Sequence, residues 1–472
     1  MSPASHVETV SRARSIQSRL PPGGLFADQH WRIAAAPLAL SPALATELES
    51  LGRILLQFYR AASQLHQQSL RQKQPAWIAR LLDQGKPVEL LALQADDAFK
   101  NALPRIIRPD LLLTEEGFAI TELDSVPGGI GLTGWLNQSY TQAGEAVIGG
   151  PDGMLSGFAG IFDEAPRVHL IVSAESAAYR PEMEWLASQL SGDRFAVRDA
   201  AFTGFVNGDA IYRFFELFDL ANILSAGTIF AKTQLGELRI TPPPRPLFEE
   251  KLLFALLWNR NLRPFWRQQL GEGFYRRLQD HVPYTWVVDP TPLPPHAAYP
   301  ELNVTDWQQL KTLSQRERDL ILKVSGYSEK AWGARGVHLG SDLSQADWSA
   351  AVEEAIDAFP QSPYILQRYH KPRLVDAEWV DLDKGEVVQM KGRVRLCPYY
   401  FVHGEGDAAR PHLGGVLATI CPADKKIIHG MRDAILAPCS IGTGPASAPA
   451  VVPERLSTAQ GKKRQEQRAQ QQ

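Results

Sequence analysis

Three acidic residues in one short stretch, Asp110, Glu122 and Asp124, are the first candidates for chemistry in this 472-residue sequence. Residues 105–124 alternate apolar and polar side chains about a central turn, which predicts a β-hairpin. Side chains two positions apart on a strand share a face, so Glu122 and Asp124 point the same way. Carboxylate oxygens with open positions beside them suit a Mg²⁺ ion that is also bound by nucleotide phosphates.

The register of this hairpin decides whether a third carboxylate joins the other two. If residues 115–117 form the loop, Thr114 pairs with Phe118 and Asp110 lies opposite Glu122. Like charges opposite one another are destabilising, so the cluster needs a compensating cation or strongly raised pKa values. The alternative is a solvated hairpin with acidic outer positions, although the apolar residues between them indicate partial burial.

A lysine in a strongly apolar stretch is the next candidate. Lys323 lies in a predicted strand over residues 319–325, directly before the glycine-containing loop 326–336. A buried strand rarely holds a lysine without a reason. The alternative is a lysine at a strand end whose ammonium group reaches solvent.

A second run of glycines, over residues 128–134, directly follows the predicted hairpin. Glycines let backbone amides approach an anion closely, so this turn is a possible anion-binding segment. An ordinary flexible connection would have the same composition.

The elements that position these residues follow from hydrophobic periodicity. Residues 42–91 repeat apolar side chains three and four apart, which predicts a layer of helices. Predicted strands at 167–173 and 194–200 flank an amphipathic helix at 181–190, the pattern of a small βαβ lobe. The proline-rich run 241–246 breaks regular structure and predicts a junction between lobes.

A second α/β unit is predicted beyond residue 319. Strands at 319–325, 337–339 and 364–369, with a helix at 347–359, are followed by further strands to residue 420. The expected fold class is α+β, built from α/β lobes. We expect four segments: 1–104, an N-terminal helical segment; 105–240, the carboxylate hairpin and an α/β substrate lobe; 241–445, a nucleotide-binding lobe; and 446–472, a polar disordered tail.

The composition argues against several functions. With 49 Lys and Arg against 52 Asp and Glu, the net charge is -3, so no nucleic-acid partner is expected. The cysteines, Cys397, Cys421 and Cys439, are odd in number, which argues against a secreted disulfide scaffold and favours the cytoplasm. No apolar stretch is long enough for a membrane span, so no membrane partner is expected. HExxH, CxxC, Walker A and GxSxG patterns are all absent, which leaves hydrolase chemistry without support.

The order of these motifs over residues 105–430 resembles that of glutathionylspermidine synthases and related circularly permuted ATP-grasp proteins. That family carries Arg-x-Asp and then Glu-x-Asn on a strand pair. This chain has Arg108 and Asp110, followed by Glu122 and Asp124, at a similar separation. The resemblance implies that the three carboxylates bind magnesium and that Arg108 faces the transferred phosphoryl group or the acyl-phosphate oxygen. Asp124 in place of Asn keeps an oxygen ligand but adds a negative charge.

Two lysines and a glycine-rich loop hold the ATP phosphates in such proteins. The resemblance assigns one role to Lys323 and the other to Lys251, in a predicted helix at 248–258 that ends in Leu-Leu-Trp. On its own, Lys251 would be an ordinary lysine on a helix surface. Gly333 and Gly336 fall in the covering loop, although their surroundings differ from the family's Arg-Glu-Gly-x-Asn-Val pattern.

The resemblance also supplies a purine-binding hinge and a phosphate-binding arginine. Gln367 and Tyr369 occupy the place where a strand ends and the backbone binds adenine. Arg395, with Arg393 as second choice, lies on a strand similar to the one that supplies an arginine to the γ-phosphate. Two exposed arginines on an edge strand are the alternative.

The implied reaction is that of a ligase. A substrate carboxylate attacks the γ-phosphate of ATP, and an amine then displaces phosphate from the acyl phosphate to form an amide. The expected ligands are ATP, Mg²⁺ and small-molecule carboxylate and amine substrates, and ligases of this kind are often homodimers. A nucleotide-binding module without turnover and a phosphotransferase remain alternatives. No cysteine precedes Cys397, so the cysteine amidase of bifunctional members is not expected.

Overall fold

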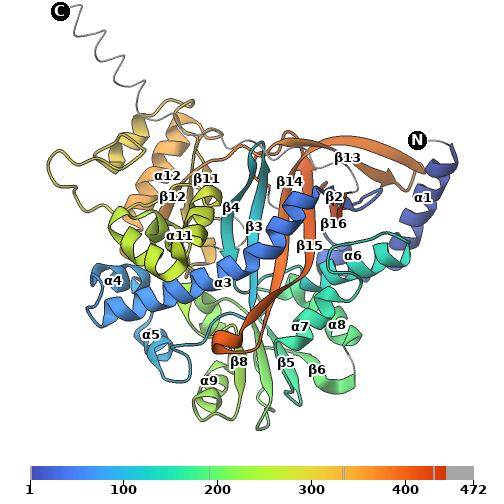
Figure 1. Cartoon of the computed structure of the whole chain (residues 1–472), viewed down its shortest axis with the longest axis horizontal. Helices are drawn as coiled ribbons and strands as arrows, with labels where there is room; N and C mark the ends of the chain where they lie inside the picture. The colour runs from blue at the N-terminus through green and yellow to red at the C-terminus, as the bar shows by residue number, and fades with distance from the viewer. Residues whose placement is uncertain (1–2, 191, 332, 334, 429–430, 443–472) are drawn as a thin grey trace, which may run out of the picture.

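In this computed structural model, residues 3–190, 192–331, 333, 335–428 and 431–442 are described, and they form three β-sheets with helices around them (Figure 1). The largest sheet has eight strands, in the order β1-β16-β15-β14-β3-β4, with β13 paired to β14 and β2 to β16. Its strands are β1 (Arg32–Ile33), β2 (Leu38–Leu40), β3 (Ile106–Thr114), β4 (Gly117–Asp124), β13 (Leu374–Asp381), β14 (Glu386–His403), β15 (Arg410–Pro422) and β16 (Ile435–Ile441). The predicted tail, 446–472, lies outside the described residues.

The hairpin of β3 and β4 is present, but its turn is tighter than expected. Thr114 pairs with Gly117 instead of Phe118, so the loop has two residues instead of three. Gly117 has a φ of 142°, a backbone conformation that glycine adopts most readily. It therefore begins the second strand instead of closing the loop.

A bulge in β4 restores the register that the shorter turn would have lost. Thr121 is the residue left over where the pairing shifts, and its hydroxyl donates to the carbonyl oxygen of Asp110 at 3.2 Å. Asp110 consequently lies opposite Glu122, as predicted.

The strand β14 lies inside the large sheet. It pairs with β3, β13 and β15, so the alternative of two arginines on an exposed edge strand is wrong. Arg395 pairs with Leu112 of β3 and Thr419 of β15. It therefore lies next to the hairpin strand that carries Asp110.

The second sheet is antiparallel and has the order β11-β10-β12-β9. Its elements are β9 (Thr285–Val287), β10 (Leu320–Val324), β11 (Val337–Leu339) and β12 (Tyr364–Arg368), which α12 (Gln345–Asp357) covers. The predicted strands β10, β11 and β12 and the predicted helix α12 are confirmed. Trp348 of α12 is fully buried with Tyr364 and Leu322 in the core of this lobe.

The third sheet is parallel and has the order β6-β5-β7-β8. Its strands are β5 (Val168–Val172), β6 (Phe195–Arg198), β7 (Ala210–Phe214) and β8 (Arg239–Thr241). The predicted βαβ unit is confirmed as β5, α8 (Arg180–Gln189) and β6. Every residue of β5 and β7 is buried, as expected for parallel strands covered on both faces.

Helices surround the sheets, and α3 crosses in front of the large sheet in Figure 1. The helices not yet given are α1 (Pro3–Gln17), α2 (Gly24–Ala27), α3 (Pro42–Leu70), α4 (Trp77–Asp83), α5 (Val88–Ala95), α6 (Ile130–Gln142), α7 (Gly153–Gly160), α9 (Ala226–Gln234), α10 (Leu252–Trp258) and α11 (Arg263–His281). The helical layer predicted over residues 42–91 is therefore present, although β1 and β2 in the N-terminal segment join the large sheet. No helix in the described part of the chain is long and apolar enough to cross a membrane.

The helix predicted at 248–258 begins later than expected. Residues Pro246–Glu249 form a 3-10 turn, and Lys251 is the N-cap residue of α10. Pro246 is at the start of this 3-10 turn, where a missing amide hydrogen costs nothing, and the α-helix begins only after Lys251. Lys251 therefore stands at the helix end instead of on the helix surface.

Candidate functional site

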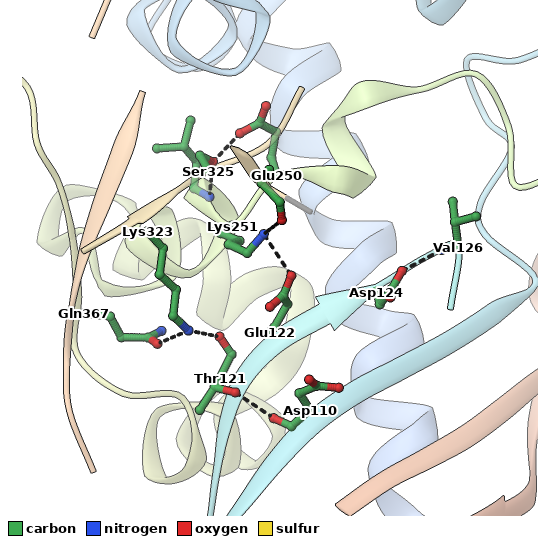
Figure 2. A network of polar contacts seen from close by, with 12 residues as sticks. Asp110, Thr121, Glu122, Asp124, Val126, Glu250, Lys251, Lys323, Ser325 and Gln367 are labelled. Atoms are coloured by element: carbon green, nitrogen blue, oxygen red, sulfur yellow. Dashed lines mark hydrogen bonds and ion pairs between the residues drawn. The ribbon is translucent and has the colours of Figure 1, made fainter. Parts of the chain in front are cut away.

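The hairpin faces the second sheet across a cleft that several of the predicted site residues line. Figure 2 shows how the side chains of the hairpin and the two lysines lie. Lys251 forms an ion pair with Glu122 at 2.8 Å. Lys323 of β10 donates to the carbonyl oxygen of Thr121 at 3.1 Å. Two lysines from separate segments thus converge on neighbouring residues of β4.

The cleft has an open volume of about 680 Å³, part of which is continuous with solvent. Apolar side chains such as Ile321, Val337 and Ile428 line it together with polar ones. The polar lining residues include six predicted for the site, namely Asp110, Glu122, Lys323, Gln367, Tyr369 and Arg395.

Lys323 is a buried cation with neutral partners. Lys323 is 6% exposed, and its Nζ atom donates to Thr121 O and to Gln367 Oε1, both at 3.1 Å. Burial lowers the pKa of Lys323 to about 8, although the charge of Glu122 acts in the opposite direction. The alternative of a solvent-exposed strand-end lysine is wrong.

Lys251 is also buried, which its sequence context did not indicate. Burial alone would lower its pKa, but the attraction of Glu122, with smaller contributions from Asp124 and Glu216, raises the pKa above its usual value. Its Nζ atom also donates to the carbonyl oxygen of Ala331 in the loop after β10 at 3.4 Å. Lys251 therefore connects the hairpin to the predicted covering loop.

Arginines compensate the carboxylates of the hairpin. Arg108 contacts Asp110 at 3.2 Å and Asp124 at 2.9 Å, and Arg395 contacts Asp110 at 3.1 Å. Burial raises the pKa of Asp124, against the attraction of Arg108 that lowers it. The predicted need for compensating cations is met by side chains of the chain itself.

The carboxylates do not form a compact metal cage. Among the described residues, no group of three or more His, Cys, Asp or Glu side chains is placed to hold a metal ion. Asp110, Glu122 and Asp124 nevertheless line one side of the hairpin, as Figure 2 shows, each with an oxygen bound to a basic group or a backbone amide. The magnesium assignment stays a prediction.

Arg393 and Arg395 have different environments, although only one residue separates them. Arg393 donates to the carbonyl oxygens of Ala423 and Pro372, at 3.1 and 2.6 Å. Arg395 instead reaches Asp110 and lines the cleft. The geometry therefore favours Arg395 over Arg393 as a ligand-binding residue.

The predicted hinge lies at one end of the cleft, at the end of β12. Gln367 accepts from Lys323 and donates to Thr285 Oγ1 at 3.1 Å, so its side chain orients the lysine. The amide of Tyr369 already donates to the carbonyl oxygen of Asp319 at 3.0 Å. A purine at this hinge would therefore have to use backbone groups other than the Tyr369 amide.

The predicted covering loop adjoins Lys251. Gly333 has a φ of 65°, and a Cβ atom at Gly336 would lie 2.6 Å from a methyl carbon of Val324. Arg335 extends from the loop to Glu175 of the parallel lobe at 2.9 Å. The loop thus contacts Lys251 through Ala331 and the parallel lobe through Arg335. The sequence did not indicate the contact with the parallel lobe.

The glycine turn after the hairpin does surround an anion, but the anion belongs to the protein. Gly129 N and Leu132 N donate to the carboxylate of Glu182 at 2.7 and 3.2 Å. Sequence reasoning missed Glu182, because an acidic residue in the first turn of a helix is common for electrostatic reasons alone.

A second pocket adjoins the cleft through Glu122, with an open volume of about 440 Å³. Four carboxylates line it, from Glu122, Asp124, Glu216 and Glu249, together with Lys251. Burial, followed by repulsion from Glu249, raises the pKa of Glu216 well above its usual range. Sequence reasoning missed both Glu216, which follows β7, and Glu249, which precedes α10. Neither residue belongs to a recognisable sequence pattern.

A larger cavity lies elsewhere. It has an open volume of about 2470 Å³ between α3, β8 and the turn joining β14 to β15. Of the charged side chains that line it, Arg105 pairs with Glu405 at 2.6 Å and Arg239 with Asp163 at 3.4 Å. None of the predicted site residues lines it, so size alone does not identify the site.

Comparison with known proteins supports the fold. No protein-family model matches the sequence, and no curated protein matches it. Among solved structures, the apo form of a glutathione synthetase-like effector (GSS30) from Globodera pallida aligns with a TM-score of 0.52 and 12% identity, over 93% of this chain and 96% of that chain. A structure named "Putative gamma-glutamylcysteine synthetase" from Methylobacillus flagellatus KT aligns with a TM-score of 0.36 and 12% identity, over 89% of this chain and 93% of that chain. The first alignment shows that the chain shares its mixed α/β fold with a synthetase-like protein.

Proposed function

We propose that the chain is an ATP-dependent carboxylate-amine ligase of the ATP-grasp type. The observation that carries this proposal is the convergence of Lys251 and Lys323, from two separate segments, on residues 121–122 of the hairpin. Buried cations beside a mixed apolar and polar cleft suit a polyphosphate attached to a planar base.

In the proposed complex, the base and the phosphates of ATP occupy different parts of the cleft. The adenine ring would lie against the apolar side chains near Gln367 and Tyr369, in the part of the cleft lined by β12. The phosphates would lie between Lys323, Lys251 and Arg395, where a negatively charged ligand would offset the cost of burying these cations. The loop that contains Gly333 and Gly336 would cover them.

The donor set at the hairpin fits Mg²⁺, although not as a cage made of protein alone. Magnesium is usually held by one or two carboxylates together with substrate phosphates and waters, and Asp110, Glu122 and Asp124 offer carboxylate oxygens for that role. When bound, the ion would neutralise charge on the phosphate oxygens. Arg108 and Lys251 would then shift from the carboxylates towards the phosphates, because they occupy those carboxylates in the absence of ligand.

The proposed reaction needs positioning and charge neutralisation more than a protein nucleophile. The substrate carboxylate attacks the γ-phosphate, ADP leaves, and the amine then displaces phosphate from the acyl phosphate. Arg108, beside Asp110 and Asp124, is placed to stabilise negative charge on the transferred group. The second pocket, with four carboxylates, suits a cationic amine substrate waiting beside the phosphates.

A nucleotide-binding module without turnover is the second candidate. It is favoured by the pairing of each hairpin carboxylate with a basic side chain and by the occupied amide of Tyr369. A phosphotransferase on the same scaffold would release ADP but leave phosphate on its product.

Release of ADP and free phosphate tests the proposal. Purified protein is incubated with ATP, Mg²⁺ and a panel of amino acids, short peptides and polyamines, beside Asp110→Ala and Lys323→Ala. Lys391→Ala is the matched control, because Lys391 is exposed and pairs with Asp376 away from the cleft. A ligase releases both products only with the correct substrates, and both site variants lose this activity. ATP binding without release identifies the module, and no ATP binding by the wild type rejects the ATP-grasp assignment.

A further inference from the structure

A carboxylate outside the predicted site is buried completely at the start of α6. Glu182, in the first turn of α8, is 0% exposed. It accepts from the amide of Gly129 through Oε1 at 2.7 Å and from the amide of Leu132 through Oε2 at 3.2 Å. Both oxygens are therefore committed to the backbone of one turn.

That turn is built for close contact with α8. A Cβ atom at Gly131 would lie 2.3 Å from the carbonyl oxygen of Glu182, and one at Gly128 would lie 2.1 Å from the ring of Tyr179. Larger residues at these two positions would push the helices apart. The glycines thus serve the approach of a protein carboxylate, which a flexible connection would not need.

The other side of the same turn holds Arg108. The carbonyl oxygen of Gly128 accepts from Arg108 Nη1 at 3.2 Å and from the hydroxyl of Tyr399 at 2.8 Å. The remaining guanidinium contacts of Arg108 are with Asp110 and Asp124. The Gly128 carbonyl therefore contacts the guanidinium from outside the hairpin.

We propose that Glu182 is a positioning residue for Arg108, acting through the turn at Gly128 and Gly129. The carboxylate fixes the amide side of the turn, the turn fixes the Gly128 carbonyl, and that carbonyl directs the guanidinium towards the hairpin carboxylates. The proposal rests on the proposed ligase function, because it assigns Arg108 to the transferred phosphoryl group.

A purely structural helix cap is the competing explanation. A cap would make α6 less stable when removed but would leave the chemistry of the folded protein unchanged. A positioning residue lowers kcat in the folded protein, because small misplacements of a charge-stabilising group reduce the rate by as much as about 100-fold. The loss of such a residue leaves the KM for ATP largely unchanged, because Arg108 stabilises charge that develops on the transferred group in the transition state.

Three variants separate these explanations. Glu182→Gln keeps the shape but offers an NH₂ group to one of the two backbone amides, and Tyr399→Phe removes one donor to Gly128. Tyr140→Phe is the matched control. Tyr140 lies on α6, which follows the turn at Gly128 and Gly129, and its hydroxyl donates to the carbonyl oxygen of Ala34 at 2.8 Å. We expect a fall in kcat of about tenfold or more for the first two and less than about twofold for the control.

A double variant tests whether Glu182 acts through Arg108. Arg108→Lys should lower kcat on its own, and adding Glu182→Gln should lower it little further, because the shared contribution is already lost. If Glu182→Gln lowers kcat by the same factor with and without Arg108→Lys, the two residues act independently. That result would overturn the proposal and leave Glu182 as a cap.

A readout that does not need turnover keeps this proposal separate from the ligase assignment. Amide hydrogen exchange at Gly129 and Leu132 should be faster in Glu182→Gln than in Tyr140→Phe, and the crystal structure of Glu182→Gln should show Arg108 displaced from Gly128. If the wild type turns over no substrate but these shifts occur, the ligase proposal fails and the positioning contact stands. An unchanged Arg108 in folded Glu182→Gln overturns the positioning proposal whatever the activity.

Discussion

Glu250 and Lys251 are neighbours in the sequence, yet they belong to buried charge clusters of different kinds (Figure 2). Glu250 pairs with Lys86 at 2.6 Å, with both side chains 1% exposed, and also accepts from the hydroxyl of Ser325. Lys251 pairs with Glu122, and Glu122 lines the cleft together with Lys323, whose two acceptors are neutral. The first cluster, Lys86–Glu250–Ser325, contains a counterion for its cation, whereas Lys323 in the second cluster donates to neutral groups.

The difference shows how a structural charge can be distinguished from one that awaits a ligand. A buried pair with its counterion and hydrogen bonds contributes to the fold without any further group. A buried cation with neutral partners makes the unliganded fold less stable, and an anionic ligand would remove that cost.

Breaking the structural pair should have the largest effect on stability. Lys86→Met leaves the Glu250 carboxylate buried without its counterion, and we expect the free energy of unfolding to fall by about 3–5 kcal/mol. Urea unfolding measures the change. The double variant Lys86→Met with Glu250→Leu should recover most of the loss, since neither charge remains. A loss below about 1 kcal/mol in Lys86→Met would remove the contrast with the cleft.

Glu182 provides a second contrast, because its buried carboxylate relies on backbone amides. Burial raises the pKa of Glu182 to about 7, against the hydrogen bonds from Gly129 and Leu132 and the charge of Arg108, which lower it. A folded pKa above the unfolded value of 4.5 gives stability that is present below pH 4.5 and lost as the pH rises through 7.

Glu182→Gln cannot ionise, so it should lack this part of the pH dependence. Relative to the variant, the wild type should lose about 3 kcal/mol of unfolding free energy between those two pH values. Chemical unfolding at several pH values measures both proteins. Parallel stability curves would contradict the assignment of this titration to Glu182.

Removing the lysine of the cleft should have the opposite sign from removing Lys86. The lowered pKa of Lys323, about 8, means that holding its proton makes the folded state less stable at neutral pH, a cost that disappears as the pH rises from 8 towards 10.5. Lys323→Met removes that cost but leaves two acceptors without a donor, so we expect a net gain of about 2 kcal/mol at pH 7. A clear loss of stability would place Lys323 with the structural charges.

The contact between the loop and the parallel lobe should have the smallest effect. Arg335 and Glu175 are 53% and 34% exposed in their side chains, so solvent screens the pair. Arg335→Ala should change stability by less than about 1 kcal/mol and raise the KM for ATP only at low salt. Lys330→Ala is the control, because its partner Glu354 lies on α12, in the same lobe as the loop. Equal changes in the KM for ATP in both variants would show that the contact between Arg335 and Glu175 has no special role in holding the loop.

The sequence predicts the local elements of the site well. The register between Asp110 and Glu122 was predicted from the wrong loop length, and the Thr121 bulge offset the error of one residue. Strand β10 was predicted because its apolar run is continuous apart from Lys323, a signal strong enough to place the lysine as well.

Burial through tertiary contacts was beyond the reach of the sequence. Lys251 resembled a surface lysine because its burial depends on β4 and on the loop after β10, which lie far away in the chain. Glu182 and Glu216 were missed for the same reason, since the residues around each buried acid lie far away in the chain. Exposed and buried acidic residues have the same local patterns.

Proton uptake on ATP binding would show whether the phosphates lie beside Lys323. Calorimetric titration at pH 8, in buffers with different ionisation heats, measures protons taken up with each Mg-ATP bound. With a pKa of about 8, Lys323 is half protonated before binding, and phosphates beside it should raise its pKa. The account predicts uptake of about half a proton by the wild type, and at least tenfold weaker binding by Lys323→Met. Binding of equal strength in both proteins, with no proton uptake in either, would contradict it.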